Sequence, residues 1–117
     1  MTGFPPEVKL LIQTRARGLC ERCGYGNSTT QLHHRRPRGM GGTKRPDTNT
    51  ASAGVLLCQP CHIEVESHRL KAYSDGWLVR QHQNPADIPV YRKGRWVLLD
   101  DEGGFHPATS DEARGVS

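Results

Sequence analysis

The stretch GVLLCQPCH, residues 54–62, joins an apolar run to a Cys-x-x-Cys pair. The run over residues 54–58 predicts a short buried strand, because it is apolar, bounded by polar segments and rich in branched side chains. A second pair, CERC at residues 20–23, is separated from the first cysteine of this stretch by 34 residues. Any bond or ion that joins the two pairs therefore closes a long segment of chain between them.

Two Cys-x-x-Cys pairs supply four thiolates at the spacing that is typical of structural zinc. No N-terminal segment has the apolar length of a secretory signal or a membrane span, so we expect a cytoplasmic protein without a membrane partner. In a reducing compartment, such pairs favour metal over disulfides. Unliganded thiols or two disulfides are the alternatives. The predicted structural Zn²⁺ is held by Cys20, Cys23, Cys58 and Cys61.

The composition indicates one small domain with a thin core. The chain has 117 residues, 34% of them hydrophobic, and a net charge of +4. A core of this size often needs a metal or disulfide to stabilise it. Residues 1–50 carry nine Lys or Arg against three Asp or Glu, which favours a polyanion partner, with an ordinary solvated surface as the alternative. Residues 102–117 are acidic and poor in apolar side chains, and predict a flexible tail.

The remaining segments predict an α+β fold. An N-terminal helix is expected within residues 1–19, after the prolines. Strands are expected at residues 31–35, 54–58 and 76–80, and as a hairpin around Lys93-Gly94. A helix is expected over residues 59–73, with Ile63 and Leu70 available for its core face. The expected organisation is the N-terminal helix, a core over residues 20–72, a β extension over 73–101, and the tail over 102–117.

Two adjacent histidines lie between the cysteine pairs, in the stretch LHHRRPRGMGG, residues 32–42. Neighbouring residues on a strand point to opposite faces, so His33 and His34 need not share a role. His62 directly follows Cys61 and begins the helix after the second pair. Joining the cysteine pairs would therefore let His33 and His62 face each other.

The motifs CERC, LHHRRPRGMGG and LLCQPCH, in this order, resemble the HNH endonuclease family, the ββα-metal nucleases. The resemblance covers about residues 20–69. It is closest to small proteins of bacteriophages and prophages that are often encoded beside the packaging terminase. It implies a small zinc-stapled ββα-metal domain, here with an N-terminal helix and a C-terminal strand pair.

The resemblance also implies roles for individual residues. His34 matches the general base that activates water, and His33 and His62 match ligands of a catalytic divalent cation, which can be Mg²⁺, Mn²⁺, Ni²⁺ or Zn²⁺. The asparagine of the family motif would fall on Ala53, so the nearest candidate to brace the base is Asn49. Glu66 follows His62 by one helical turn. It is a candidate third ligand, a carboxylate that orients His62, or a solvated side chain.

The predicted function is a divalent-metal-dependent DNA endonuclease that hydrolyses phosphodiester bonds, by nicking or by cutting both strands. Basic side chains of the loop are candidates to contact DNA phosphates, with a solvated loop as the alternative; they are Arg35, Arg36, Arg38, Lys44 and Arg45. One alternative function is a zinc-stapled DNA-binding module without catalysis. The other is an accessory protein that works with phage terminase subunits.

Overall fold

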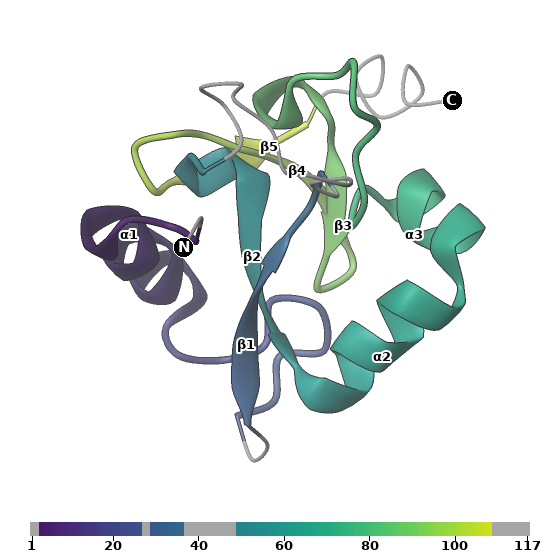
Figure 1. Cartoon of the computed structure of the whole chain (residues 1–117), viewed down its shortest axis with the longest axis horizontal. Helices are drawn as coiled ribbons and strands as arrows, with labels where there is room; N and C mark the ends of the chain where they lie inside the picture. The colour runs from purple at the N-terminus through teal and green to yellow at the C-terminus, as the bar shows by residue number, and fades with distance from the viewer. Residues whose placement is uncertain (1–2, 27–28, 37–48, 109–117) are drawn as a thin grey trace.

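The computed structural model describes residues 3–26, 29–36 and 49–108, which form an α+β fold with antiparallel strand pairs (Figure 1). The helices are α1 (Pro6–Ala16), α2 (Gln59–Ser67) and α3 (Arg69–Asp75), with 3₁₀ turns η2 (Ala51–Ala53) and η3 (Pro85–Asp87). The strands are β1 (Thr30–His34), β2 (Gly54–Cys58), β3 (Val90–Arg92), β4 (Arg95–Leu99) and β5 (Phe105–Pro107).

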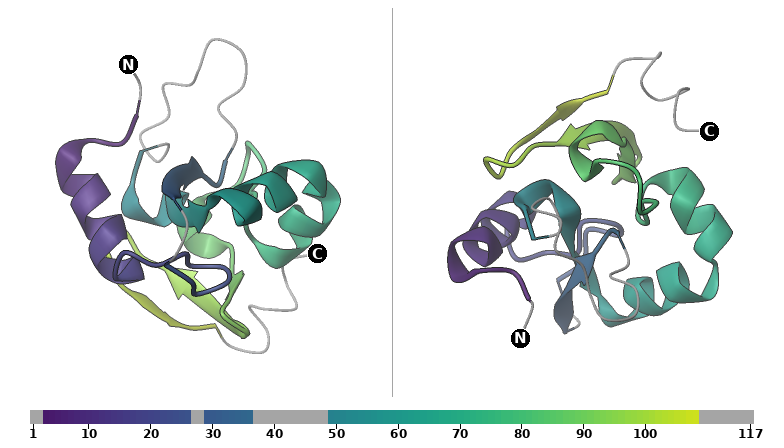
Figure 2. Two further views of the ribbon diagram at one scale, coloured as in Figure 1. Left: turned by 90° about the horizontal axis from the view of Figure 1, so that it is seen from below. Right: turned by 45° about the horizontal axis from the view of Figure 1, so that its top comes forward.

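β1 and β2 form an antiparallel ribbon at the centre of the fold, with α1 on one side and α2 and α3 on the other (Figures 1 and 2). Every residue of β2 is buried. Its side chains alternate between two cores: Val55 and Leu57 pack with Trp77 and Val65, whereas Leu56 packs on the α1 side. Burial on both faces explains why this strand is apolar throughout rather than alternating.

The predicted hairpin around Lys93-Gly94 is confirmed, and it belongs to the three-stranded sheet β3-β4-β5. Lys93 and Gly94 have φ angles of 51° and 82°, the left-handed pair that a tight two-residue hairpin turn requires. The prediction of a flexible tail from residue 102 is wrong for part of that range. β5 pairs with the free edge of β4, with Phe105 opposite Leu99. Residues 109–117 of the predicted tail lie outside the described residues.

The predicted helix over residues 59–73 is divided at His68, whose φ of −124° and ψ of 64° are not helical. Ile63 and Leu70 are 55% and 80% exposed, so the predicted core face is wrong. The buried positions are instead Cys61 and Val65 of α2, one turn apart, and Ala72 of α3. The Cys61 thiol has to reach the other cysteines, and this requirement sets the rotation of α2 about its axis.

The predicted strand over residues 76–80 does not form. These residues form a turn and bends followed by irregular chain, and Trp77, Leu78 and Val79 are nonetheless buried. The Val79 N–H donates to the Arg35 carbonyl oxygen over 2.7 Å. This segment therefore fills the core beside the end of β1 without joining a sheet.

A buried ion cluster ties α1, the first cysteine pair and β3 together. Arg15 donates to both carboxylate oxygens of Glu21 over 2.8 Å, and Arg92 donates to one of them over 3.0 Å. The Leu56 N–H also donates to this carboxylate, over 2.9 Å. These contacts give each of the three buried charged groups a partner of opposite charge. Without such partners, burying the charges would destabilise the fold. None of the helices in residues 3–26, 29–36 and 49–108 has the length and apolar character needed to cross a membrane.

Candidate metal centres

The four cysteines converge where the first turn after α1 meets the junction of β2 and α2. Their sulfur atoms all lie within 4.8 Å of one another, and no disulfide joins them. The Sγ atoms of Cys23 and Cys58 are 3.7 Å apart. A tetrahedral Zn²⁺ with Zn–S bonds of about 2.3 Å would hold its sulfurs about 3.8 Å apart. Cys20, Cys23, Cys58 and Cys61 are therefore placed to bind a metal ion such as zinc.

The surroundings of the cysteines suit thiolate ligands. Burial by itself raises the pKa of Cys20, but backbone N–H groups near Cys23 and Cys58 donate to its sulfur and lower the pKa to about 7. Burial raises the pKa of Cys61 to about 12. Arg22 donates to the Cys61 sulfur over 3.3 Å. A dication held by these cysteines would favour the deprotonated form of the coordinating thiols and would offset the raised pKa of Cys61.

A second cluster joins β1 to α2. His33, His62 and Glu66 each offer one ligand atom, and these atoms all lie within 4.8 Å of one another. The two imidazole rings have centroids 5.4 Å apart and are nearly perpendicular. His62 and Glu66 share a face of α2, because they are one turn apart. Two nitrogens and one carboxylate form a ligand set that suits Zn²⁺, Ni²⁺ or Mn²⁺.

His33 is buried, and its surroundings keep it neutral. Burial lowers the pKa of His33 to about 4, so the ring carries no charge at neutral pH. Its Nε2 lies 3.2 Å from the Trp77 carbonyl oxygen, which can only accept a hydrogen bond. The proton is therefore on Nε2, and the lone pair of Nδ1 remains available for a metal.

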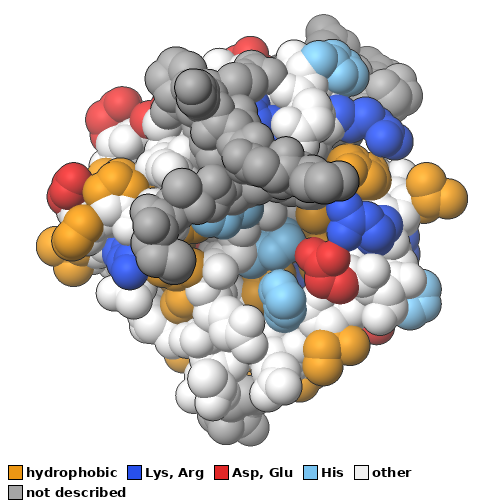
Figure 3. Space-filling view, viewed as in Figure 1, with side chains coloured by type: hydrophobic (Ala, Val, Ile, Leu, Met, Phe, Trp, Pro, Cys, Tyr) orange, Lys and Arg blue, Asp and Glu red, His pale blue; other side chains and the backbone are white. Residues whose placement is uncertain are grey.

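Glu66 is exposed and has an ion-pair partner. Arg69 donates to its carboxylate over 2.7 Å, and both side chains are 43% exposed. Figure 3 shows histidine side chains gathered on one face of the molecule with an acidic side chain beside them. The second cluster is thus open to solvent on the side where its carboxylate lies.

His34 is in contact with Asn49 and Phe4. Its Nε2 is 2.9 Å from the Asn49 Oδ1, and its ring stacks on Phe4 with centroids 4.1 Å apart and an angle of 12° between the planes. Asn49 is the residue that the sequence offered as a brace for His34. Phe4 was missed, because nothing local in the N-terminal segment indicates a partner on β1.

Gly54 makes room for Phe4. It is the residue opposite His34 in the β1–β2 pairing. A Cβ atom at this position would come within 2.5 Å of the Phe4 ring. A glycine directly across the ribbon from His34 therefore allows the aromatic ring to cover the imidazole.

The prediction that Arg35 and Arg36 contact DNA phosphates is wrong. Arg35 is fully buried, and its guanidinium donates to four backbone carbonyl groups, those of Ser52, Gly76, Pro85 and Ile88. Arg36 is 2% exposed and donates to the Gln83 carbonyl oxygen. Both guanidinium groups organise the backbone around the end of β1. Arg38, Lys44 and Arg45 lie outside the described residues.

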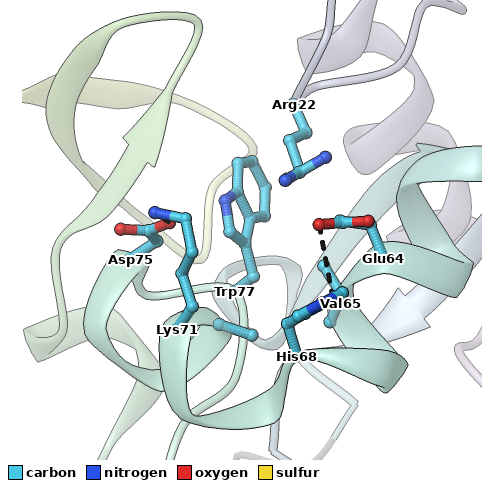
Figure 4. A pocket seen from close by; sticks show the side chains of 8 residues that line it. Arg22, Glu64, Val65, His68, Lys71, Asp75 and Trp77 are labelled. Atoms are coloured by element: carbon cyan, nitrogen blue, oxygen red, sulfur yellow. Dashed lines mark ion pairs between the residues drawn. The ribbon is translucent and has the colours of Figure 1, made fainter.

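A shallow pocket lies between the first cysteine pair and the α2–α3 pair (Figure 4). Its charged side chains have partners: Glu64 contacts His68 over 3.3 Å, Lys71 pairs with Asp75 over 3.2 Å, and Arg22 donates to the Cys61 sulfur. The indole of Trp77 forms its floor. The side chains that line this pocket therefore already interact with other groups of the protein.

No family model, no curated protein and no solved structure matches this chain. The functional proposal therefore depends on the chemistry of the two clusters and on the motifs in the sequence.

Proposed function

We propose that the protein is a divalent-metal-dependent DNA endonuclease of the HNH type. The observation that carries this proposal is the proximity of His33, His62 and Glu66, whose ligand atoms lie within 4.8 Å of one another. Beside them on β1 is His34, an imidazole with a hydrogen-bond partner of its own. A ligand set next to a separate base is what metal-assisted hydrolysis requires.

His33, His62 and Glu66 would hold the catalytic cation, with Cys20, Cys23, Cys58 and Cys61 holding a structural zinc. When bound, the cation would stabilise the negative charge that grows on the phosphate and on the leaving oxygen. The buried, neutral ring of His33 needs no proton removed before it can serve as a ligand. Three protein ligands leave positions open for a phosphate oxygen, as a catalytic rather than structural site requires.

His34 would act as the general base. The Asn49 Oδ1 atom can only accept, so the 2.9 Å contact assigns the proton to Nε2 and leaves the lone pair on Nδ1. That nitrogen would take the proton from the attacking water. Asn49 sets the orientation of the ring in its own plane, and Phe4 covers one face of it. Together they would limit the motion of the base to the orientation that reaches the water.

A zinc-stapled DNA-binding module without catalysis is the competing function. Such a module needs the four cysteines and a basic surface, but it needs no second set of ligand atoms such as the one that His33, His62 and Glu66 supply. The contact between His33 and His62 therefore favours the nuclease. A role beside a phage packaging terminase, in the cytoplasm of the bacterial host, is a further part of the proposal, and a pull-down with terminase subunits tests it.

The decisive experiment is cleavage of supercoiled plasmid by the purified protein across a series of divalent cations. We expect nicked or linear product with a cation, and none after chelation by EDTA. The matched variant is His33→Ala, for which a higher cation concentration should restore part of the activity. Binding of DNA by wild-type protein without cleavage under any cation would favour the binding module instead.

A further inference from the structure

Two side chains of α3, and one from the segment that follows this helix, lead away from the histidine cluster. Arg69 is paired with Glu66 over 2.7 Å. Tyr73 follows Arg69 by four residues and therefore lies on the same face of the helix. The Arg80 guanidinium stacks over the Tyr73 ring, 4.2 Å from its centroid. Arg69, Tyr73 and Arg80, which we call the α3 arginine strip, thus begin at a candidate ligand of the catalytic cation and lead away from it.

The strip differs from the buried arginines in what its charges contact. The buried arginines are Arg15, Arg35 and Arg92. Their guanidinium groups donate hydrogen bonds to backbone carbonyl oxygens and to the Glu21 carboxylate. Arg69 is 43% exposed, and Arg80 is exposed. Exposed guanidinium groups remain able to bind phosphate with two parallel N–H donors. Among the described residues, Arg69 and Arg80 therefore present exposed positive charge on this side of the molecule, whereas Arg35 does not.

The Glu66–Arg69 pair connects the strip to the cation site. Once the Glu66 carboxylate is shared with a cation, Arg69 carries positive charge that this carboxylate no longer balances. A phosphate group can supply the missing negative charge. Further along, the face of the Tyr73 ring holds Arg80 by a cation–π contact, which fixes the direction of its guanidinium.

We propose that the α3 arginine strip binds the phosphate backbone of the DNA substrate beside the cleavage site. The inference rests on the proposed nuclease function and adds the surface that holds the duplex. Contacts with phosphate groups do not distinguish one base from another. The strip therefore contributes to the affinity for DNA and to its position, and not to sequence preference.

The test compares Arg69→Gln and Arg80→Gln with Lys71→Gln. Lys71 lies on the same helix, is exposed, and pairs with Asp75 off the face of the strip. All are made in a His34→Ala background, so that DNA stays intact during binding. Binding of a short random-sequence duplex is measured in Mn²⁺ over a series of salt concentrations. Mn²⁺ binding to the zinc-loaded protein is followed separately by electron paramagnetic resonance.

We expect the slope of log K against log salt to become shallower by about 1 for each strip variant, because each loses one phosphate contact. Lys71→Gln should keep the wild-type slope. The Mn²⁺ affinity of Arg69→Gln should not fall, because a positive charge near the cation has been removed. If Arg69 only oriented Glu66 as a ligand, its loss would weaken Mn²⁺ binding and leave the salt slope unchanged.

The proposal would be overturned if the slope of log K against log salt were unchanged in both strip variants. It would also be overturned if Lys71→Gln changed this slope by the same amount. If the wild-type protein cleaves plasmid while the strip variants bind DNA as the His34→Ala protein does, only this inference fails. If the wild-type protein neither binds nor cleaves DNA, the proposed function and the inference fail together.

Discussion

At the scale of single residues, His33 and His34 are neighbours in the chain with different surroundings. His33 faces His62 and donates to a backbone carbonyl group, whereas His34 faces Phe4 and Asn49. The alternation of side chains along β1 separates them. Substitutions at these two positions should therefore have different consequences.

His34→Ala should reduce cleavage by about a hundredfold to ten-thousandfold, the range for loss of a general base. The ring is not among the residues that gather around either metal cluster, so zinc content and DNA affinity should stay near their wild-type values. Plasmid cleavage, zinc analysis and duplex binding are measured together. Full cleavage by this variant at neutral pH would contradict the assignment of His34 as the base.

Phe4→Leu should lower kcat and leave KM nearly unchanged. Leucine keeps most of the buried apolar volume but lacks the flat face on which His34 stacks. Misplacing a catalytic group by a fraction of an ångström can cost about tenfold or more in rate. Leu10→Ala, an exposed change on α1, is the control that should retain activity, whereas a loss of rate explained entirely by a lower melting temperature would count against a positioning role.

At the scale of elements, the cysteine cluster joins segments that are distant in sequence. Cys20 follows α1, Cys58 ends β2, and Cys61 lies in the first turn of α2. α2 also carries His62, so the position of a candidate catalytic ligand depends on the cysteine beside it. A metal ion in the cluster would hold the end of the β1–β2 ribbon and the start of α2 in one arrangement.

Cys58→Ala should lower the melting temperature sharply or cause aggregation, rather than give a folded inactive protein. A structural zinc site contributes its binding free energy to folding, and three thiolates hold the ion less well than four. Thermal melts and zinc content, compared with those of His34→Ala, check this. A variant that kept its zinc and its melting temperature would exclude the cluster as a structural site.

β5 should contribute measurably to stability. A chain that ends after residue 103 lacks β5, whereas one that ends after residue 108 keeps it. All three residues of β5 are exposed, so we expect a loss of only about 1 kcal/mol, equivalent to about 4–8 °C in melting temperature. Melting curves of the two truncated chains isolate the strand, and equal curves would show that its pairing with β4 adds nothing.

At the scale of the whole molecule, the Glu21 ion cluster connects parts of the chain that the cysteines do not reach. Glu21 accepts hydrogen bonds from Arg15 on α1, Arg92 on β3 and Leu56 on β2. It therefore links the N-terminal helix and the C-terminal sheet to the central ribbon. The Glu21 carboxylate is thus the shared counter-charge of two buried guanidinium groups, those of Arg15 and Arg92.

Glu21→Gln should destabilise the fold by about 3–5 kcal/mol, because it leaves two buried positive charges without a counter-charge. Urea denaturation measures the free energy of unfolding, and Glu7→Gln, an exposed change on α1, is the control. An effect as small as that of the control would show that the cluster is not stabilising.

The same carboxylate should make the fold sensitive to acid. Burial alone raises the pKa of Glu21, but the hydrogen bonds and charge of Arg15 outweigh it, and the net pKa is below its ordinary value of 4.5. The folded state therefore binds this proton less readily than the unfolded state does. The stabilisation is complete above about pH 4.5 and is lost as the pH falls through the folded pKa. Glu21→Gln should remove this part of the pH dependence in melts taken across the acid range.

The local features of this chain follow from the sequence by itself. The Cys-x-x-Cys spacing predicted the four-sulfur cluster, because two residues between ligands place both thiols on one turn. The apolar run predicted β2, and Lys93-Gly94 predicted the hairpin, because each depends on residues close together in the chain. The histidine stretch and the histidine after Cys61 indicated His33 and His62 as members of the second cluster.

Only the tertiary structure decided which polar side chains are buried. Arg35 is a basic loop residue by composition, yet its donors are satisfied by carbonyl groups 17–53 positions further along the chain. Phe4 reaches His34 across a glycine on another strand, and the rotation of α2 follows from where Cys61 must point. The free energy of a buried charge or ring depends on which groups surround it. Those groups come from distant parts of the chain, so they cannot be predicted from the spacing and periodicity of residues along the sequence.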